Sequence, residues 1–139
     1  MGKGDALKLA IRALETEDLE SLSPEDLGED LIRLEDISRS FEAERVRRLG
    51  VFDERKGYVL FDHPSTVSFL RHNARMSGTR ANLLVSMARM ARKFRSTYLS
   101  WKYGQVSTDQ AHQLFRAAEQ MENPRSSTSV ARRGSSPPP

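Results

Sequence analysis

The chain of 139 residues contains no cysteine, so disulfide bonds, cysteine-ligated zinc and thiol nucleophiles are all excluded. No apolar run in the sequence approaches the roughly 18 residues that a membrane-spanning helix needs. Lys8 and Arg12 interrupt the apolar stretch near the N-terminus, which therefore does not fit a secretory signal peptide. We expect a cytoplasmic protein with no membrane partner.

Motifs of the common catalytic sites are also missing. No serine sits on a glycine-flanked elbow, and no glycine-rich loop is present to hold a phosphate. The pair His72-Asn73 matches two letters of an HNH nuclease motif, but it lacks a companion histidine at useful spacing and a nearby carboxylate. We therefore predict no catalytic residue, no metal site, no cofactor and no enzymatic activity for this chain alone.

Acidic residues are absent from one long window. Residues 63–108 contain eight Lys or Arg and no Asp or Glu, whereas residues 1–62 contain ten Lys or Arg against sixteen Asp or Glu. Two interpretations stay open at this point. The oppositely charged regions attract each other within the fold, or the basic region faces nucleic acid while the acidic region faces water.

The remaining pattern predicts an all-α fold built on one long helix over residues 24–55. Ser23 is suited to cap this helix, Pro24 to begin it, and Lys56-Gly57 to end it. A shorter amphipathic helix is expected to precede it over residues 5–15, and the apolar run 58–61 is expected to form a brief extended segment in the core.

A helix of that length also raises the question of a coiled coil. With Leu27 at a d position, only five of the eight a and d sites are apolar, because Ser38, Arg45 and Arg48 interrupt the seam. Packing against the rest of the domain therefore explains the long helix better than a sustained coiled coil. Self-association through the long helix, with a second copy, remains the alternative.

Several short helices are expected to form a basic bundle over residues 65–121. Ser65 or Thr66, Ser77 and Ser107 are the expected caps of three of them, and Gly104 is suited to close the helix before the last. The helical domain is predicted to span residues 1–122. A tail rich in Ser, Pro and Arg, residues 123–139, is predicted to be disordered because it cannot bury enough apolar surface.

The two helices on either side of Met76-Ser77 have the spacing of a helix-turn-helix, whose second helix enters the major groove of DNA. The candidate DNA-binding residues are the arginines, lysine and polar residues along this pair: Arg71, Arg75, Thr79, Arg80, Asn82, Arg89, Arg92, Lys93 and Arg95. A merely solvated basic face, or one paired with the acidic long helix, is the competing interpretation. Tyr98, Trp101 and Tyr103 suit stacking on single-stranded bases, although their spacing is more typical of core residues.

Three stretches of residues 57–119 carry a family resemblance. Ser65-Thr66-Val67-Ser68-Phe69-Leu70-Arg71 is similar to an S-T-x-x-W-L-x helix, with Phe69 in the place of tryptophan. Met76-Ser77 through Ala81 to Ala88 resembles an L-S-x-x-x-A-x-x-x-x-x-x-A segment. Gly104-Gln105-Val106-Ser107-Thr108-Asp109-Gln110-Ala111 resembles the turn and helix G-x-[IV]-S-x-x-Q-A, the most specific of the three.

Together these stretches resemble the domain of unknown function number 222, a helical N-terminal domain that is abundant in actinobacteria and usually precedes an HNH endonuclease domain. The resemblance covers most of residues 20–122 and implies association with DNA-cleaving proteins. It carries over no catalytic residue, because the chain stops before the position of the nuclease domain. We thus expect a truncated, non-catalytic module that binds or positions DNA through the basic residues 63–108, or alternatively a protein-interaction or dimerisation module without a nucleic-acid role.

Overall fold

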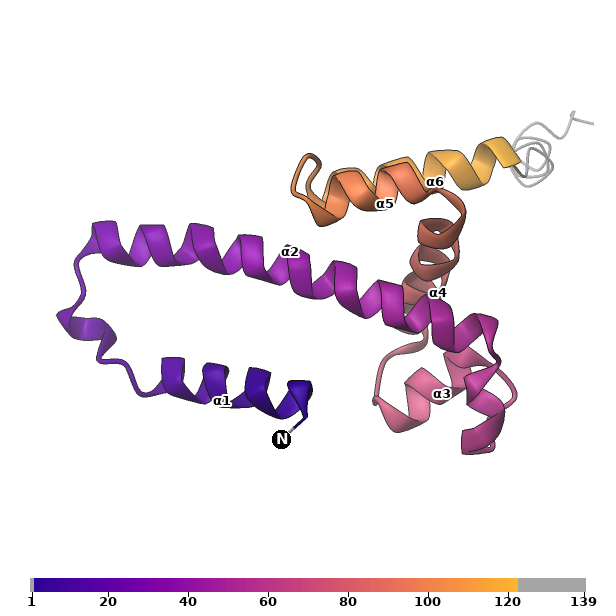
Figure 1. The fold of residues 1–139 in the computed structure, drawn as a ribbon, viewed down its shortest axis with the longest axis horizontal. Coiled ribbons are helices and arrows are strands. Elements are labelled where there is room, and N and C mark those ends of the chain that lie inside the picture. Colours follow the sequence, from indigo (N-terminus) through magenta and orange to yellow (C-terminus); the bar gives the residue numbers. More distant parts are fainter. Residues whose placement is uncertain (1, 123–139) are drawn as a thin grey trace, which may run out of the picture. The chain divides into compact units, whose positions relative to one another are not determined.

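The computed structural model describes residues 2–122, and all regular elements in that range are helical, in agreement with the predicted all-α fold. The predicted disordered tail, residues 123–139, lies outside the described residues. The α-helices are α1 (Lys3–Glu15), α2 (Pro24–Glu54), α3 (Thr66–Asn73), α4 (Gly78–Lys93), α5 (Arg95–Lys102) and α6 (Thr108–Glu122) (Figure 1). Two short 3-10 helices are η1 (Leu19–Ser21) and η2 (Gly57–Phe61).

The helix ends follow from side chains that the sequence places at the caps. The hydroxyls of Ser23, Ser65 and Ser77 each accept a hydrogen bond from the backbone amide three residues later, at 3.0–3.2 Å. Ser107 and Gln110 form a reciprocal pair, in which each backbone amide donates to the other side chain, at 2.8 and 3.1 Å. The predicted caps are therefore confirmed, and they fix where α2, α3, α4 and α6 begin.

Gly104 ends α5 in the left-handed conformation, with a φ of 80°. The amide of Gly104 donates to the Trp101 carbonyl at 3.1 Å, and the amide of Gln105 donates to the Ser100 carbonyl at 2.8 Å. This pair of hydrogen bonds defines a Schellman motif, which satisfies carbonyls that the helix end would leave free. The glycine was expected to close this helix, and it does.

The chain divides into two units, Met1–Asp36 and Ile37–Pro139, with α2 beginning in the first and ending in the second. The first unit contains α1, η1 and the first turns of α2. None of the residues 2–36 is buried. The first unit therefore has no hydrophobic core of its own.

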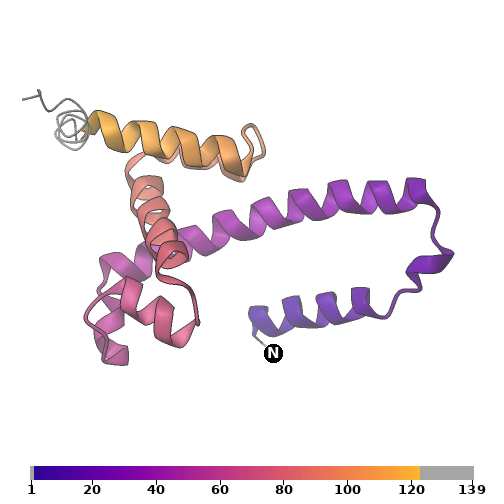
Figure 2. The same ribbon diagram turned by 180° about the vertical axis from the view of Figure 1, so that it is seen from behind.

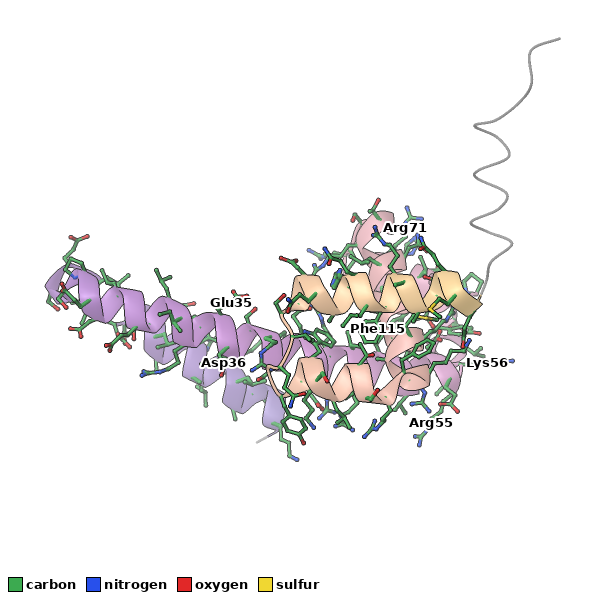
Figure 3. All side chains as sticks on the ribbon, turned by 90° about the horizontal axis from the view of Figure 1, so that it is seen from above. Glu35, Asp36, Arg55, Lys56, Arg71 and Phe115 are labelled. Atoms are coloured by element: carbon green, nitrogen blue, oxygen red, sulfur yellow. The ribbon has the colours of Figure 1, made fainter. Side chains whose placement is uncertain are left out.

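The second unit holds the core, in which α4 runs between α3 and the α5–α6 pair (Figures 1 and 2). Trp101 is fully buried at its centre, and its ring makes edge-on contacts with the rings of Tyr98 and Phe115 at centroid distances of 6.3 and 6.4 Å. The indole N–H donates to the Thr108 hydroxyl at 3.1 Å, so burial leaves no polar atom of this side chain without a partner. Figure 3 shows Phe115 between α5 and α6.

The second half of α2 is tied to this core by hydrogen bonds and by close packing. The Tyr98 hydroxyl donates to the Ala43 carbonyl at 3.2 Å, and the Arg39 guanidinium donates to the Trp101 carbonyl at 2.9 Å near the end of α5. Gly50 lies against α4 so closely that a Cβ at this position would be 3.3 Å from the Ala88 carbonyl oxygen. The long helix thus packs on shorter ones, as predicted, through its residues from Arg39 onward.

The prediction of an extended segment at residues 58–61 was wrong. These residues form η2, a 3-10 helix flanked by Lys56 and Asp62, both in the left-handed conformation with φ of 51° and 59°. The amides of Val59 and Asp62 close successive turns on carbonyls three residues earlier, at 3.1 Å. With no strand among the described residues to pair with, an apolar run this short satisfies its backbone internally. Val59, Leu60 and Phe61 are exposed and do not enter the core.

A search of the described residues for a helix long and apolar enough to cross a membrane finds none.

Replacing Trp101 with alanine should destabilise the second unit by about 3–5 kcal/mol, because it removes the largest fully buried side chain and leaves a cavity. Urea unfolding followed by circular dichroism measures the change. Tyr103→Ala is the matched control: this nearby aromatic side chain is exposed, and its loss should change stability by less than about 0.5 kcal/mol. Equal effects of the two substitutions would contradict the placement of Trp101 at the centre of the core.

Candidate nucleic-acid interface

The turn between α3 and α4 spans four residues, 74–77, and has a defined backbone path. The amides of Ala74 and Met76 both donate to the Leu70 carbonyl, at 3.1 and 3.2 Å. Arg75, between them, is in the left-handed conformation with a φ of 57°. An arginine in this conformation is unusual, since a Cβ costs roughly 1 kcal/mol there. The turn therefore positions the Arg75 side chain at a backbone site that glycine would occupy more easily.

Five of the predicted residues gather at this turn, and we call them the α3–α4 corner: Arg71, Arg75, Thr79, Arg80 and Asn82. All five are exposed. The Arg71 side chain reaches the start of α4, where a Cβ on Gly78 would be 3.7 Å from its Nε atom, and Figure 3 labels it at the edge of the bundle. The Asn82 side-chain amide donates to the Gly78 carbonyl at 2.9 Å.

The three arginines of the corner have no ion-pair partner among residues 2–122. The first turn of α4 also contains no acidic residue, so the positive end of its helix dipole is not neutralised by a side chain. The corner thus combines three exposed arginine side chains with the start of α4.

Arg89, also a predicted DNA contact, has a different role within the fold. Its guanidinium donates to both carboxylate oxygens of Asp53, with Nε to Oδ2 at 2.9 Å and a terminal nitrogen to Oδ1 at 3.1 Å. The buried Thr66 hydroxyl donates to the same Oδ1 at 2.5 Å. The Arg89 hydrogen bond, followed by that from Thr66, holds the pKa of the Asp53 carboxyl below its ordinary value against the opposing effect of burial. Asp53 therefore joins α2, α3 and α4.

The other basic candidates lie further along the chain from the corner. Arg92 forms an ion pair with Glu54 and Lys93 one with Glu122, which brings acids from α2 and α6 onto the basic end of α4. The Arg95 guanidinium lies over the Tyr98 ring at 5.7 Å. The structure thus separates the nine predicted residues into five at the corner and four elsewhere. Arg89 and Arg92 pair with the long helix, as the competing interpretation had it.

The aromatic residues considered for base stacking divide in the same way. Tyr98 and Trp101 are buried in the core, where no base can reach them. Tyr103 is exposed, and the Lys102 ammonium lies over its ring at 5.5 Å. The core interpretation therefore holds for Tyr98 and Trp101.

The histidines assemble no metal site among the described residues, and the hollow between α4 and α6 is small. The His63 and His72 rings lie 5.4 Å apart and both contact Ser68, but no group of three or more potential ligands surrounds a common point among the residues described. A surface hollow of about 220 Å³ between α4 and α6 is lined by side chains that include His112 and Arg116. This volume is below the range usual for small-molecule sites, about 300–1,000 Å³.

Asp53 was not predicted to pair with a basic residue of the segment 63–108. A signal was present: Val46, Gly50 and Asp53 follow helical spacing, so a carboxylate falls on the same face as buried residues. A carboxylate on such a face requires a cation or several hydrogen-bond donors. The identity of that cation, 36 residues away, could not be read from the spacing.

Comparisons of the chain with protein families, with curated proteins and with solved structures found no match. The interpretation of the α3–α4 corner therefore depends on its own chemistry. That chemistry consists of exposed guanidinium groups, hydroxyl and amide side chains, and a helix N-terminus, all of which bind anions.

Substituting Asp53 with asparagine should destabilise the fold by about 1–3 kcal/mol at neutral pH, because Arg89 and Thr66 lose their charged acceptor. The pKa of Asp53 is lowered in the folded state, so its stabilisation is complete above the ordinary pKa of aspartate and is lost as pH falls through the folded value. The difference in unfolding free energy between wild type and variant should therefore shrink from pH 7 to pH 3.

Urea unfolding at a series of pH values measures that difference. Glu17→Gln, which removes an exposed carboxylate outside the network, is the control and should show little difference at any pH. A difference for Asp53→Asn that stays constant down to pH 3 would contradict the charged network.

Proposed function

We propose that this chain is a non-catalytic helical domain that binds or positions duplex DNA through the α3–α4 corner. The proposal depends chiefly on one observation: Arg71, Arg75 and Arg80 are exposed together, and no acidic side chain of the described residues pairs with them. Exposed arginines that face no acid are available to neutralise phosphates, which supplies most of the affinity of DNA-binding domains.

The geometry of the corner is compatible with such contacts. Two helices joined by a short turn resemble a helix-turn-helix, in which the first residues of the second helix reach base edges. Thr79, Arg80 and Asn82 occupy those positions at the start of α4, and Arg71 and Arg75 flank them. Arginine and asparagine carry the donors that match guanine and adenine edges, so the corner combines phosphate contacts with possible base contacts.

The resemblance to the domain of unknown function number 222 supports the same partner. Proteins with that domain usually carry an HNH endonuclease domain after it, so the resemblance implies association with DNA-cleaving proteins. Under this proposal the chain contributes binding and contributes no catalytic residue.

Ion pairs within the fold reduce the number of basic residues in the proposed DNA-binding surface. Arg89, Arg92 and Lys93 already neutralise Asp53, Glu54 and Glu122, so transferring them to phosphates would break those ion pairs. We therefore assign the main contacts to the corner and a secondary role to Arg95. The net charge of the corner alone should then set the salt dependence of binding.

Reversing the three corner arginines, as Arg71→Glu, Arg75→Glu and Arg80→Glu together, should abolish binding to duplex DNA and leave helicity unchanged. For the wild-type chain, log K should fall against log salt concentration with a slope of about −2.7, if each arginine neutralises one phosphate. Fluorescence anisotropy with a short labelled duplex measures affinity, and circular dichroism measures helicity.

The control is a variant with the same change of net charge on α1: Lys3→Glu, Lys8→Glu and Arg12→Glu together. It should retain most of the affinity, because those residues lie outside the corner. If the wild-type chain fails to bind DNA at low salt, or if both triple variants lose affinity equally, the proposal fails.

Arg75→Gly separates binding from stability. Glycine adopts the left-handed conformation without the Cβ penalty, so the variant should be at least as stable as wild type in urea unfolding. Its DNA affinity should nevertheless fall, and the salt slope should decrease in magnitude by about 0.9, because one cation is lost. Arg75→Ala, which keeps the backbone penalty, should lose the same affinity and be less stable than Arg75→Gly. A loss of stability in Arg75→Gly would show that the side chain acts through the fold.

A further inference from the structure

The first unit, Met1–Asp36, contains two amphipathic helical segments but no interior. None of its described residues, 2–36, is buried, and no side chain of α1 is covered by a neighbouring element. Units of fewer than about 40 residues generally need a metal, disulfides or oligomerisation to be stable. The chain has no cysteine, and the described residues assemble no metal-ligand cluster. Association with another surface is one source of such a core.

The apolar side chains of these helices form continuous stripes. On α1, Leu7, Ile11 and Leu14 share one face and are each just over half exposed. On α2 the stripe repeats at the same helical spacing, with exposed fractions of 45–67%, and consists of Leu31, Leu34, Ile37 and Phe41. A single exposed leucine needs no explanation, but seven large apolar side chains in register on two helices indicate a contact surface.

The stripe of α2 is not the face that packs in the second unit. Val46 and Gly50, which are buried there, are displaced from Phe41 by about 140° and 180° around the helix axis. Ile37 and Phe41, the stripe residues that belong to the second unit, therefore remain about half exposed.

The charges of α1 and α2 indicate which surface covers the α2 stripe. Residues 24–36 of α2 carry six acidic side chains and one arginine, and Figure 3 labels two of the acids, Glu35 and Asp36. Two such segments placed side by side would repel each other. By contrast α1 carries three basic and two acidic residues, so its charge is opposite to that of α2.

We infer that a second copy of this chain covers the stripes, with α1 of each copy packed against the α2 stripe of the other. This pairing is isologous, because each copy supplies the same two surfaces, and it brings four helices together around a shared apolar centre. At roughly 80 Å² for each half-exposed side chain, two copies bury on the order of 1,100 Å² of apolar surface. A specific interface needs about 1,000 Å². This association is independent of DNA binding by the α3–α4 corner.

Sedimentation equilibrium of the full chain, without DNA, tests the inference. The wild-type chain should be a dimer at tens of micromolar. Leu31→Lys with Leu34→Lys should raise the dimer dissociation constant by roughly tenfold per substitution, because each lysine places a charge in the apolar centre. Both positions are exposed in the single chain, so the core of the second unit should stay intact, which the fluorescence of Trp101, the only tryptophan, reports.

Ile32→Lys is the matched control, since Ile32 is exposed on the same helix but lies off the stripe. It should leave the dimer unchanged, and Ile11→Lys on α1 should weaken it. A wild-type chain that is monomeric at 100 µM overturns the inference, whether its stripes stay bare or are covered by another protein. A dimer that survives Leu31→Lys with Leu34→Lys, or that Ile32→Lys weakens equally, also overturns it.

Discussion

The second unit depends on the carboxylate of Asp53 on α2, which accepts hydrogen bonds from Arg89 on α4 and from Thr66 on α3. The Asp53 side chain is only 12% exposed, so a carboxylate there without these donors would be strongly unfavourable. The same contact determines which basic residues remain available. Arg89 is held within the fold, and the arginines of the corner are left facing solvent.

Local signals explain why much of the fold could be predicted. The caps at Ser65, Ser77 and Ser107 and the closing turn at Gly104 depend on atoms a few residues apart, and each was identified from the sequence. Contacts between distant residues could not be predicted in this way. Lys93 and Glu122 are separated by 29 residues, and nothing in the sequence near either one indicates the other. The structure places the five corner residues at the surface, and it pairs Arg89, Arg92 and Lys93 with acids that the sequence did not point to.

The proposed binding surface and the inferred contact surface are on different parts of the chain and have different chemistry. The α3–α4 corner is basic and belongs to the unit that contains the core, whereas the stripes of α1 and α2 are apolar. A dimer would carry two corners, so a DNA molecule that reaches both would be held more tightly than by one alone. Each proposal can nevertheless hold or fail without the other.

The close contact between α2 and α4 at Gly50 limits which residues this position can hold. Because Gly50 has no side chain, α2 can lie directly against α4: a Cβ at this position would be 3.3 Å from the Ala88 carbonyl oxygen. Asp53 follows Gly50 by about one turn of the same helix, so any residue that pushes α2 outward at Gly50 also moves the carboxylate away from Arg89. Packing at Gly50 and the ion pair between Asp53 and Arg89 are thus coupled. A larger residue at Gly50 would separate the Arg89 guanidinium from its carboxylate.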